Sequence, residues 1–147
     1  MPAPKALVTG LNKVLADSFV LYFKTHSFHW NVTGPNFKSL HTFFEEMYTE
    51  QWNAIDEIAE RLRSLGEWAP ETLKNILSTA SIKEAGQMPD AEGMVEILAA
   101  DNRALVETMK SALKKASDAG DEVTAGLLVE RIAIHEKNAW MLESSRE

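Results

Sequence analysis

One uninterrupted helical pattern, running from Phe37 to Leu65, constrains the fold of this chain more than any other feature. When its residues are turned by about 100° per step, they separate into an apolar face, a hydrophilic face and a face that mixes acidic, histidine and aromatic side chains. The apolar face is typical of a helix that packs into a bundle. It comprises Leu40, Phe44, Met47, Gln51, Ile55, Ile58, Leu62 and Leu65. The pattern therefore predicts a long helix that buries one side and leaves the mixed face for another role.

The mixed face carries two pairs of metal-ligating side chains. His41 and Glu45 form one pair, Asp56 and Glu60 form the other, and each pair is spaced i, i+4. Side chains at this spacing project next to each other from a helix and can share one cation. His41 and Asp56 are nevertheless about 22 Å apart at helical rise, because fifteen residues separate them. One chain therefore cannot close a single site from both pairs.

A second copy of the helix resolves this separation. If two copies pack antiparallel about a two-fold axis near Tyr48 and Thr49, His41 of one copy lies against Asp56 of the other. Such a contact is isologous, so each dimer carries two identical sites. A single histidine or glutamate at these positions is most often an ordinary surface or core residue. Their joint placement on one face indicates a metal site that two chains share.

The segment before this helix supplies a third ligand candidate. Residues 33–36 break the helical pattern, and we expect Asn36 to cap the second helix. A turn centred on Pro35 makes the two helices an antiparallel hairpin, in which His29 and His41 stand six residues on either side of the centre. The hairpin therefore places His29 beside His41. Considered alone, His29 is more simply a histidine bonded to a backbone carbonyl or a carboxylate.

The rest of the chain repeats the helical pattern without any strand pattern or internal repeat. Breaker residues near Gly66, Gly86 and Gly120 separate the segments. These features predict a single all-α domain over residues 1–147, a four-helix bundle with a short extra helix in the crossover between helices 2 and 3. The expected helices are 4–32, 37–65, 71–77, 90–116 and 122–143.

The composition narrows the classes of function. With 147 residues and no cysteine, the chain fits one domain and can hold a transition metal only through imidazole and carboxylate groups. No apolar run has the length needed to span a bilayer, and residues 1–10 lack the layout of a signal peptide, so we expect a cytoplasmic protein with no membrane partner.

The charge makes DNA an unfavourable partner. A net charge of −7 repels phosphate, and no basic tail compensates for it, since only Lys5 precedes the first helical pattern. Lys13, Lys24 and Lys38 supply at most a weak, salt-sensitive surface. We therefore expect DNA binding to be weak or absent.

The motifs point away from a metal centre inside one bundle. Such a centre usually needs Glu-x-x-His motifs, and none of the four histidines has a glutamate three residues before it. The sequence instead resembles the Dps proteins, or miniferritins, of the ferritin-like superfamily, over nearly its whole length. The resemblance rests on His29-Trp30-Asn31, Gly34, Phe37, Leu40-His41, Phe44, the segment IDEIAER at 55–61, Leu65-Gly66 and Ala69.

This resemblance implies a dodecameric hollow shell with ferroxidase sites at its two-fold interfaces. Its catalytic metal ligands would be His29 and His41 from one subunit, with Asp56 and Glu60 from the partner. Glu45 stands where the family often has Asp, which makes it a bridging or supplementary ligand. The implied chemistry is oxidation of Fe(II), two ions per site, by hydrogen peroxide or O2. Ferric mineral stored in the shell would then protect the cell against oxidative damage.

Two further residue pairs each have two interpretations. Trp30 and Trp52 either absorb oxidising equivalents near the site or simply pack. Asp121 and Glu122 either line an acidic three-fold pore, as in the family, or serve only as the first residues of the last helix. Gly126 departs from the family pattern, because another acidic residue often stands there.

Two other classes of function remain beside the iron-storing ferroxidase. The first is a DNA-compacting structural protein with minor ferroxidase activity, for which a flexible basic tail would be the discriminating feature. The second is an iron-free helical shell or adhesion protein that kept the fold and lost the centre. The ligand set in this sequence favours the ferroxidase.

Overall fold

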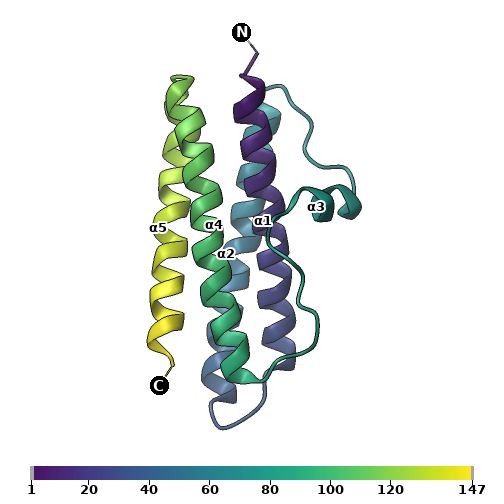
Figure 1. The fold of residues 1–147 in the computed structure, drawn as a ribbon, viewed down its shortest axis with the longest axis vertical. Helices are drawn as coiled ribbons and strands as arrows, with labels where there is room; N and C mark the ends of the chain where they lie inside the picture. Colours follow the sequence, from purple (N-terminus) through teal and green to yellow (C-terminus); the bar gives the residue numbers. More distant parts are fainter. Residues whose placement is uncertain (1, 147) are drawn as a thin grey trace.

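The computed structural model describes residues 2–146, and helices run through most of them. Four long helices lie side by side as a bundle, and a short fifth helix lies outside it (Figure 1). No strand occurs within residues 2–146. The predicted all-α four-helix bundle with one extra helix is confirmed. The helices are α1 (Lys5–Asn31), α2 (Phe37–Ser64), α3 (Leu73–Thr79), α4 (Ala91–Asp118) and α5 (Glu122–Ser144).

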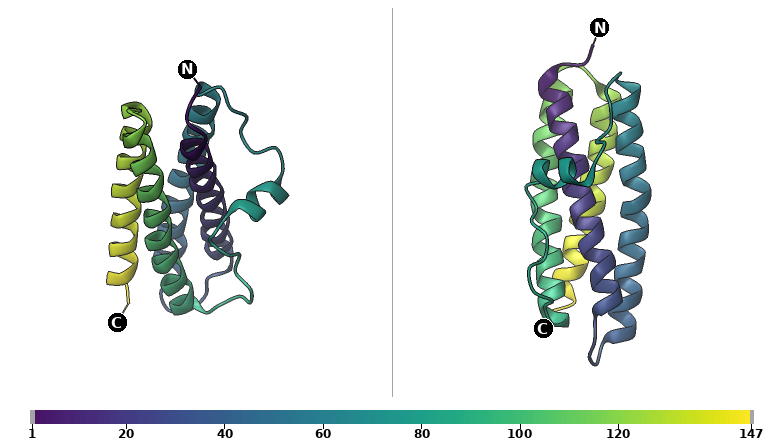
Figure 2. Two further views of the ribbon diagram at one scale, coloured as in Figure 1. Left: turned by 45° about the horizontal axis from the view of Figure 1, so that its top comes forward. Right: turned by 90° about the vertical axis from the view of Figure 1, so that its right-hand side faces the viewer.

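A long crossover determines how the two halves of the bundle are joined. Short turns make hairpins of α1 with α2 and of α4 with α5, whereas residues 65–90 run along the length of the bundle and carry α3 (Figures 1 and 2). Consequently α2 and α4 run in the same direction, and α3 packs against α1. α3 lies beside α1, on the side that faces away from α5 (Figures 1 and 2).

Four of the five helices begin within one residue of the position expected from the sequence. α3 begins two residues later than expected, at Leu73, because Thr72 caps it by accepting a 3.1 Å hydrogen bond from the backbone N–H of Asn75. Asn36 is the N-cap residue of α2, as expected, although its side chain makes no capping hydrogen bond. Gly34 has φ of 110°, a conformation that favours glycine and allows the tight α1–α2 turn.

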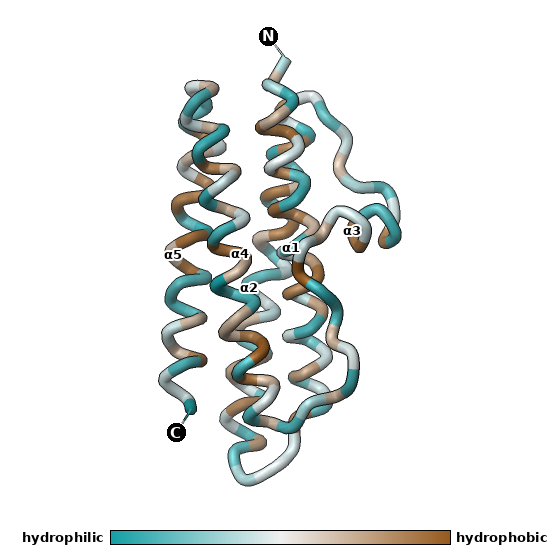
Figure 3. The backbone as a smooth tube through the Cα atoms, in the orientation of Figure 1, coloured by the Kyte–Doolittle hydropathy of each residue, from teal (hydrophilic) through white to brown (hydrophobic). Residues whose placement is uncertain are grey.

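The core is apolar along the inner sides of all four long helices, where Figure 3 shows recurring hydrophobic segments. Phe44, Ile58 and Leu62 of the predicted α2 stripe are fully buried. Contrary to the sequence-based expectation, α1 is long and apolar enough to cross a membrane. Most of that segment is buried in the bundle, so its apolar side chains form the core.

Asp17 of α1 fastens the crossover to the bundle. Its buried carboxylate accepts hydrogen bonds from the backbone N–H groups of Ser81 and Ile82, at 2.6 and 2.9 Å, and from the hydroxyl of Thr108 on α4, at 2.9 Å. Charge-assisted bonds to backbone donors are strong when water is excluded. They hold the segment after α3 against α1 and α4.

A second buried polar network joins α2, α4 and α5. Both oxygens of the Glu50 carboxylate accept bonds from the guanidinium of Arg131, which also donates to Nε2 of His135 at 2.9 Å. The Nδ1–H of His135 donates to the side-chain oxygen of Asn102 at 2.8 Å, because Nε2 is already an acceptor. Burial, and then the charge of Arg131, lower the pKa of His135 to about 3. His135 is therefore a neutral core residue.

This network predicts a loss of stability in acid. The unfolded chain protonates His135 near its ordinary value of about 6.5, whereas the folded chain does so only near about 3. As pH falls between these values, the free energy of unfolding should drop by up to about 1.4 kcal/mol per pH unit from this group. His135→Gln, whose amide can accept from Arg131 and donate to Asn102, should remove that contribution. Urea unfolding at fixed protein concentration measures the free energy of unfolding. If this free energy depends equally on pH in wild type and in His135→Gln, the assignment is refuted.

Candidate metal centre

The hairpin of α1 and α2 brings His29 and His41 together, as their spacing predicts. Their imidazole rings stack with centroids 3.8 Å apart and planes inclined by 15°. Nδ1 of His29 lies 2.7 Å from the carbonyl oxygen of His41, and Nδ1 of His41 lies 2.7 Å from the carbonyl oxygen of His29. Each histidine ring is therefore held in its orientation by a hydrogen bond to the backbone of the other helix.

These reciprocal bonds determine which ring nitrogen is available to a metal. A carbonyl oxygen only accepts hydrogen bonds, so Nδ1 must carry the proton in both rings. In neutral imidazole this leaves the lone pair on Nε2, and a backbone carbonyl bonded to Nδ1–H is the usual partner of a metal-binding histidine. The hairpin thus presents two imidazoles, one from each helix, in the tautomer that a metal ion needs.

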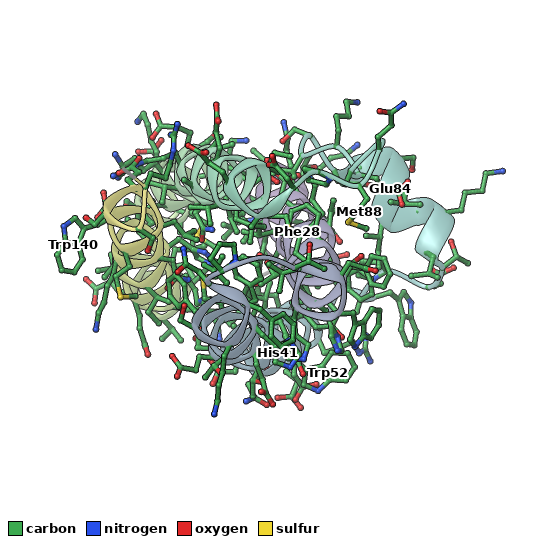
Figure 4. The ribbon with its side chains drawn as sticks, turned by 90° about the horizontal axis from the view of Figure 1, so that it is seen from below. Phe28, His41, Trp52, Glu84, Met88 and Trp140 are labelled. Atoms are coloured by element: carbon green, nitrogen blue, oxygen red, sulfur yellow. The ribbon has the colours of Figure 1, made fainter. Side chains whose placement is uncertain are left out.

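The ring pair lies at the edge of the bundle. Figure 4 shows His41 and Trp52 on the outer side of α1 and α2, whereas Phe28 points into the interior. His29 is 8% exposed, and His41 is partly buried. The two helices α1 and α2 therefore hold the imidazoles, and the outer side is open to a partner or an ion.

The carboxylates do not complete a site in the same chain. Glu45, Asp56 and Glu60 are all exposed on α2. Within residues 2–146, no three histidine, aspartate or glutamate side chains lie close enough to hold one metal ion. Each protomer displays two separated parts of a ligand set, the imidazole pair and the carboxylate pair Asp56–Glu60. Their union across a two-fold axis stays a prediction.

An aromatic patch occupies the surface between the two parts. His26 stacks on Tyr48 with ring centroids 3.8 Å apart, and it lies 4.3 Å from Trp30. Trp30 and Trp52 are more than half exposed, at 57% and 58%. Contiguous exposed aromatics of this kind mark interaction surfaces. The aromatic patch comprises Tyr22, Phe23, His26, Trp30, Tyr48 and Trp52.

Sequence reasoning missed the contact between Tyr22 and His26 within this patch. The Tyr22 hydroxyl and Nδ1 of His26 are 2.9 Å apart on one face of α1. Their i, i+4 spacing was the available signal. Burial, and then the neighbouring His29, lower the pKa of His26, whereas burial, and then Tyr48, raise the pKa of Tyr22.

The expected pore residues are placed differently from each other. Asp121 caps α5 by accepting from the backbone N–H of Thr124 at 3.0 Å, and Arg61 of α2 donates to it at 3.1 Å. Partial burial opposes ionisation of Asp121, but the bonds from Thr124 and Arg61 prevail and lower its pKa. Glu122 is exposed beside it. The helix-start role of Asp121 is therefore present in the protomer, and a pore role stays a prediction.

The weak basic surface expected for DNA is smaller than predicted. Lys24 is buried, and its ammonium group lies 2.7 Å from the carboxylate of Asp101 on α4. Lys24 therefore joins two helices inside the bundle, where it cannot reach a phosphate. Spacing alone did not reveal this, because the partner is 77 residues away in the sequence.

Comparison with known proteins identifies the family and the fold. A model of the ferritin-like domain matches residues 8–146. DNA protection during starvation protein 2 of Bacillus anthracis is 43% identical over 140 residues, which cover 95% of this chain and 96% of that protein. The crystal structure of Dps from Staphylococcus aureus matches with a TM-score of 0.94 and 36% identity, over 100% of this chain and 99% of that one.

The chain belongs to the Dps family. A further Dps structure, from Vibrio cholerae, matches with a TM-score of 0.90 and 35% identity over 94% of this chain and 87% of that one. That protein is described as a member of a broad superfamily of ferritin-like diiron-carboxylate proteins. The helix layout, and the crossover helix with it, is therefore the Dps fold along nearly the whole chain.

The imidazole pair of this Dps chain yields a direct spectroscopic prediction. The metal-free protein should hold His29 and His41 with the proton on Nδ1, because each Nδ1 faces a backbone carbonyl oxygen. The ¹⁵N chemical shifts of labelled histidine report the tautomer, and His29→Gln and His41→Gln assign the signals. His26 should show the opposite tautomer if its Nδ1 accepts from Tyr22. Protonated Nε2 at His29 or His41 would contradict the proposed ligand geometry.

Proposed function

We propose that this Dps-family protein is a ferroxidase that oxidises Fe(II) at sites shared between two subunits and stores the ferric product in a hollow dodecameric shell in the cytoplasm. The observation that carries the proposal is the pair of reciprocal hydrogen bonds that leaves Nε2 of His29 and His41 free. A structural histidine pair has no need for two unprotonated nitrogens on an open edge of the bundle.

The donor set suits iron. His29 and His41 supply imidazole nitrogen, which binds Fe(II), and Asp56 and Glu60 supply carboxylate oxygen, which favours the harder Fe(III) product. Glu45, one turn from His41, can bridge to a second ion or stay a supplementary ligand. Two Fe(II) ions each give one electron to hydrogen peroxide, or in smaller amounts to O2. The peroxide oxygens leave as water, and Fe(III) hydrolyses to the stored mineral.

The aromatic patch fits a two-fold interface between the paired sites. Its exposed tryptophans would be covered by the partner's copy of the same patch, as an isologous contact requires. This packing sets the imidazole pair of one subunit against the carboxylate pair of the next. Trp30 and Trp52 then lie close to the iron, where they can give up an electron when oxidation proceeds in single-electron steps.

DNA compaction is the second candidate, because relatives carry the name DNA protection during starvation protein. The observations favour protection of DNA by removal of Fe(II) and peroxide over protection by direct binding to DNA. The net charge is −7, and one of the three lysines considered for a phosphate surface is buried in an ion pair. Removing Fe(II) and peroxide would spare DNA from hydroxyl radicals without any protein–DNA interface.

Two pairs of substitutions test the shared site. Replacing His29 and His41 with Ala, or Asp56 and Glu60 with Ala, should each slow Fe(II) oxidation more than about 100-fold, since even outer partners of metal sites cost about 10–100-fold. Ferric absorbance after anaerobic Fe(II) loading and peroxide addition measures the rate. Glu57→Ala, an exposed carboxylate on the hydrophilic face of α2, is the matched control and should oxidise iron normally.

Mixing the two inactive proteins separates a shared site from a site within one chain. After dissociation and random reassembly, half of the dimers are mixed, and each mixed dimer holds one complete site, so about one quarter of the wild-type activity should return. No recovery, with normal assembly on size exclusion, would rule out ligands drawn from two subunits. Wild-type rates in both parent variants would reject the site itself.

A further inference from the structure

Asp17 is a buried carboxylate that the proposed metal centre does not use. Its side chain is fully buried in α1, and four hydrogen-bond donors converge on it. One oxygen accepts from the backbone N–H groups of Ser81 and Ile82, and the other accepts from the hydroxyl groups of Ser81, at 2.7 Å, and Thr108. All four donors are neutral, so these bonds offset the cost of burying the charge. Three of the four bonds come from the crossover.

The crossover has little other packing against the bundle. Ile76 is the buried residue of α3, and Ile82 is the next buried residue along the chain. Ile76 lines a cavity of about 480 Å³ and a second cavity of about 260 Å³. Side chains beside a cavity lack partners for dispersion contacts on that side. The bonds to Asp17 therefore contribute a large share of what holds the crossover in place.

The larger cavity lies between the crossover and the aromatic patch. Leu73 and Leu77 of α3, and Met88 after it, are exposed apolar side chains that line this cavity. Three members of the aromatic patch line the same cavity, namely Tyr22, Phe23 and Trp52. The apolar surface thus continues from the patch onto the crossover, and such a surface marks an interaction site. Because the patch is the proposed two-fold interface, the occupant that this continuous surface fits is a second copy of the chain.

We propose that Asp17 is an assembly latch, whose bonds to residues 81 and 82 hold the crossover where a second copy of the chain packs against its apolar side chains. This inference rests on the proposed shared site, because a misplaced partner would not bring its carboxylate pair to the imidazole pair. With the latch closed, the apolar surface is already ordered, so less conformational entropy is lost when two copies associate. With the latch open, the crossover leaves its place while the core of the four long helices stays packed.

The donors determine which replacements of Asp17 keep the latch. A backbone N–H can only donate, whereas a hydroxyl group can donate or accept. Asparagine can therefore keep both backbone bonds through its carbonyl oxygen and donate its amide protons to the hydroxyl oxygens of Ser81 and Thr108. Alanine offers no acceptor and leaves both backbone N–H groups without a partner. Asp17→Asn should consequently keep the latch, and Asp17→Ala should release it.

Hydrogen exchange of the assembled, metal-free protein, measured by mass spectrometry, tests the latch. Asp17→Ala should speed exchange over residues 75–82 by at least about 100-fold. Ser81→Ala removes one bond to the charged carboxylate from an exposed position and should speed this exchange by about 10-fold. Thr108→Val removes a bond from α4 and none from the crossover, so it is the matched control and should exchange near the wild-type rate.

The result for Ser81→Ala is decisive because this substitution leaves the core untouched. Exchange in α2 and α5 should keep the wild-type rate in this variant. Unchanged exchange over residues 75–82, or an equal rise in α2 and α5, would overturn the proposal even if Asp17→Ala failed to fold.

Surface substitutions on α3 test the partner independently of the latch. Leu73→Glu with Leu77→Glu adds two charges beside the larger cavity and should abolish assembly, as measured by sedimentation velocity. Asn75→Glu with Thr79→Glu adds the same charge beside the smaller cavity and should assemble as wild type does. All four residues are exposed, so the bundle does not need them to fold. Normal assembly of the leucine variant would show that no second copy covers this surface and would overturn the proposal.

These measurements need no iron, which separates the latch from the proposed function. A wild-type protein that assembles but does not oxidise Fe(II), together with the expected exchange in Ser81→Ala, would reject the ferroxidase and support the latch. A wild-type protein that oxidises Fe(II), together with unchanged exchange in Ser81→Ala, would reject the latch and leave the ferroxidase standing.

Discussion

The rigid length of α2 is the constraint on which the proposed site depends. His41 and Asp56 lie on one straight helix, fifteen residues apart, so no side-chain motion can bring them to one ion. A shorter helix or a kink would allow a site within one chain, but α2 is continuous from Phe37 to Ser64. The proposed function therefore depends on assembly, with each subunit supplying one part of the ligand set.

The interior of the bundle is unfavourable for a metal ion. The region between α2, α4 and α5 holds Arg131, His135 and Asn102 in a closed hydrogen-bond network, with Glu50 as the partner of the guanidinium. A metal cation placed among them would face the buried positive charge of Arg131. The neutral state of His135 follows from burial, and then from the same charge, which together lower its pKa. In this chain the core polar groups hold helices together, and the outer edge of α1 and α2 carries the candidate chemistry.

Sequence patterns predicted those features that depend on periodicity and on position along the chain. The four long helices, the crossover and the contact of His29 with His41 followed from helical spacing and from a turn centred on Pro35. Sequence patterns did not predict the features that depend on partners far away in the sequence. Lys24 became a buried ion-pair residue because Asp101 of α4 lies opposite it, and the apolar length of α1 became core because three other elements cover it. Asn36 occupies the expected capping position without making the bond.

The proposed iron site takes imidazole from one subunit and carboxylate from another. Anomalous diffraction at the iron absorption edge, from crystals loaded anaerobically with Fe(II), tests it most directly. We expect an anomalous peak at the dimer interface, bonded to Nε2 of His29 and His41 from one subunit and to the carboxylates of Asp56 and Glu60 from its two-fold mate. Iron bound through Nδ1, iron held by residues of one subunit alone, or iron absent from this interface would contradict it.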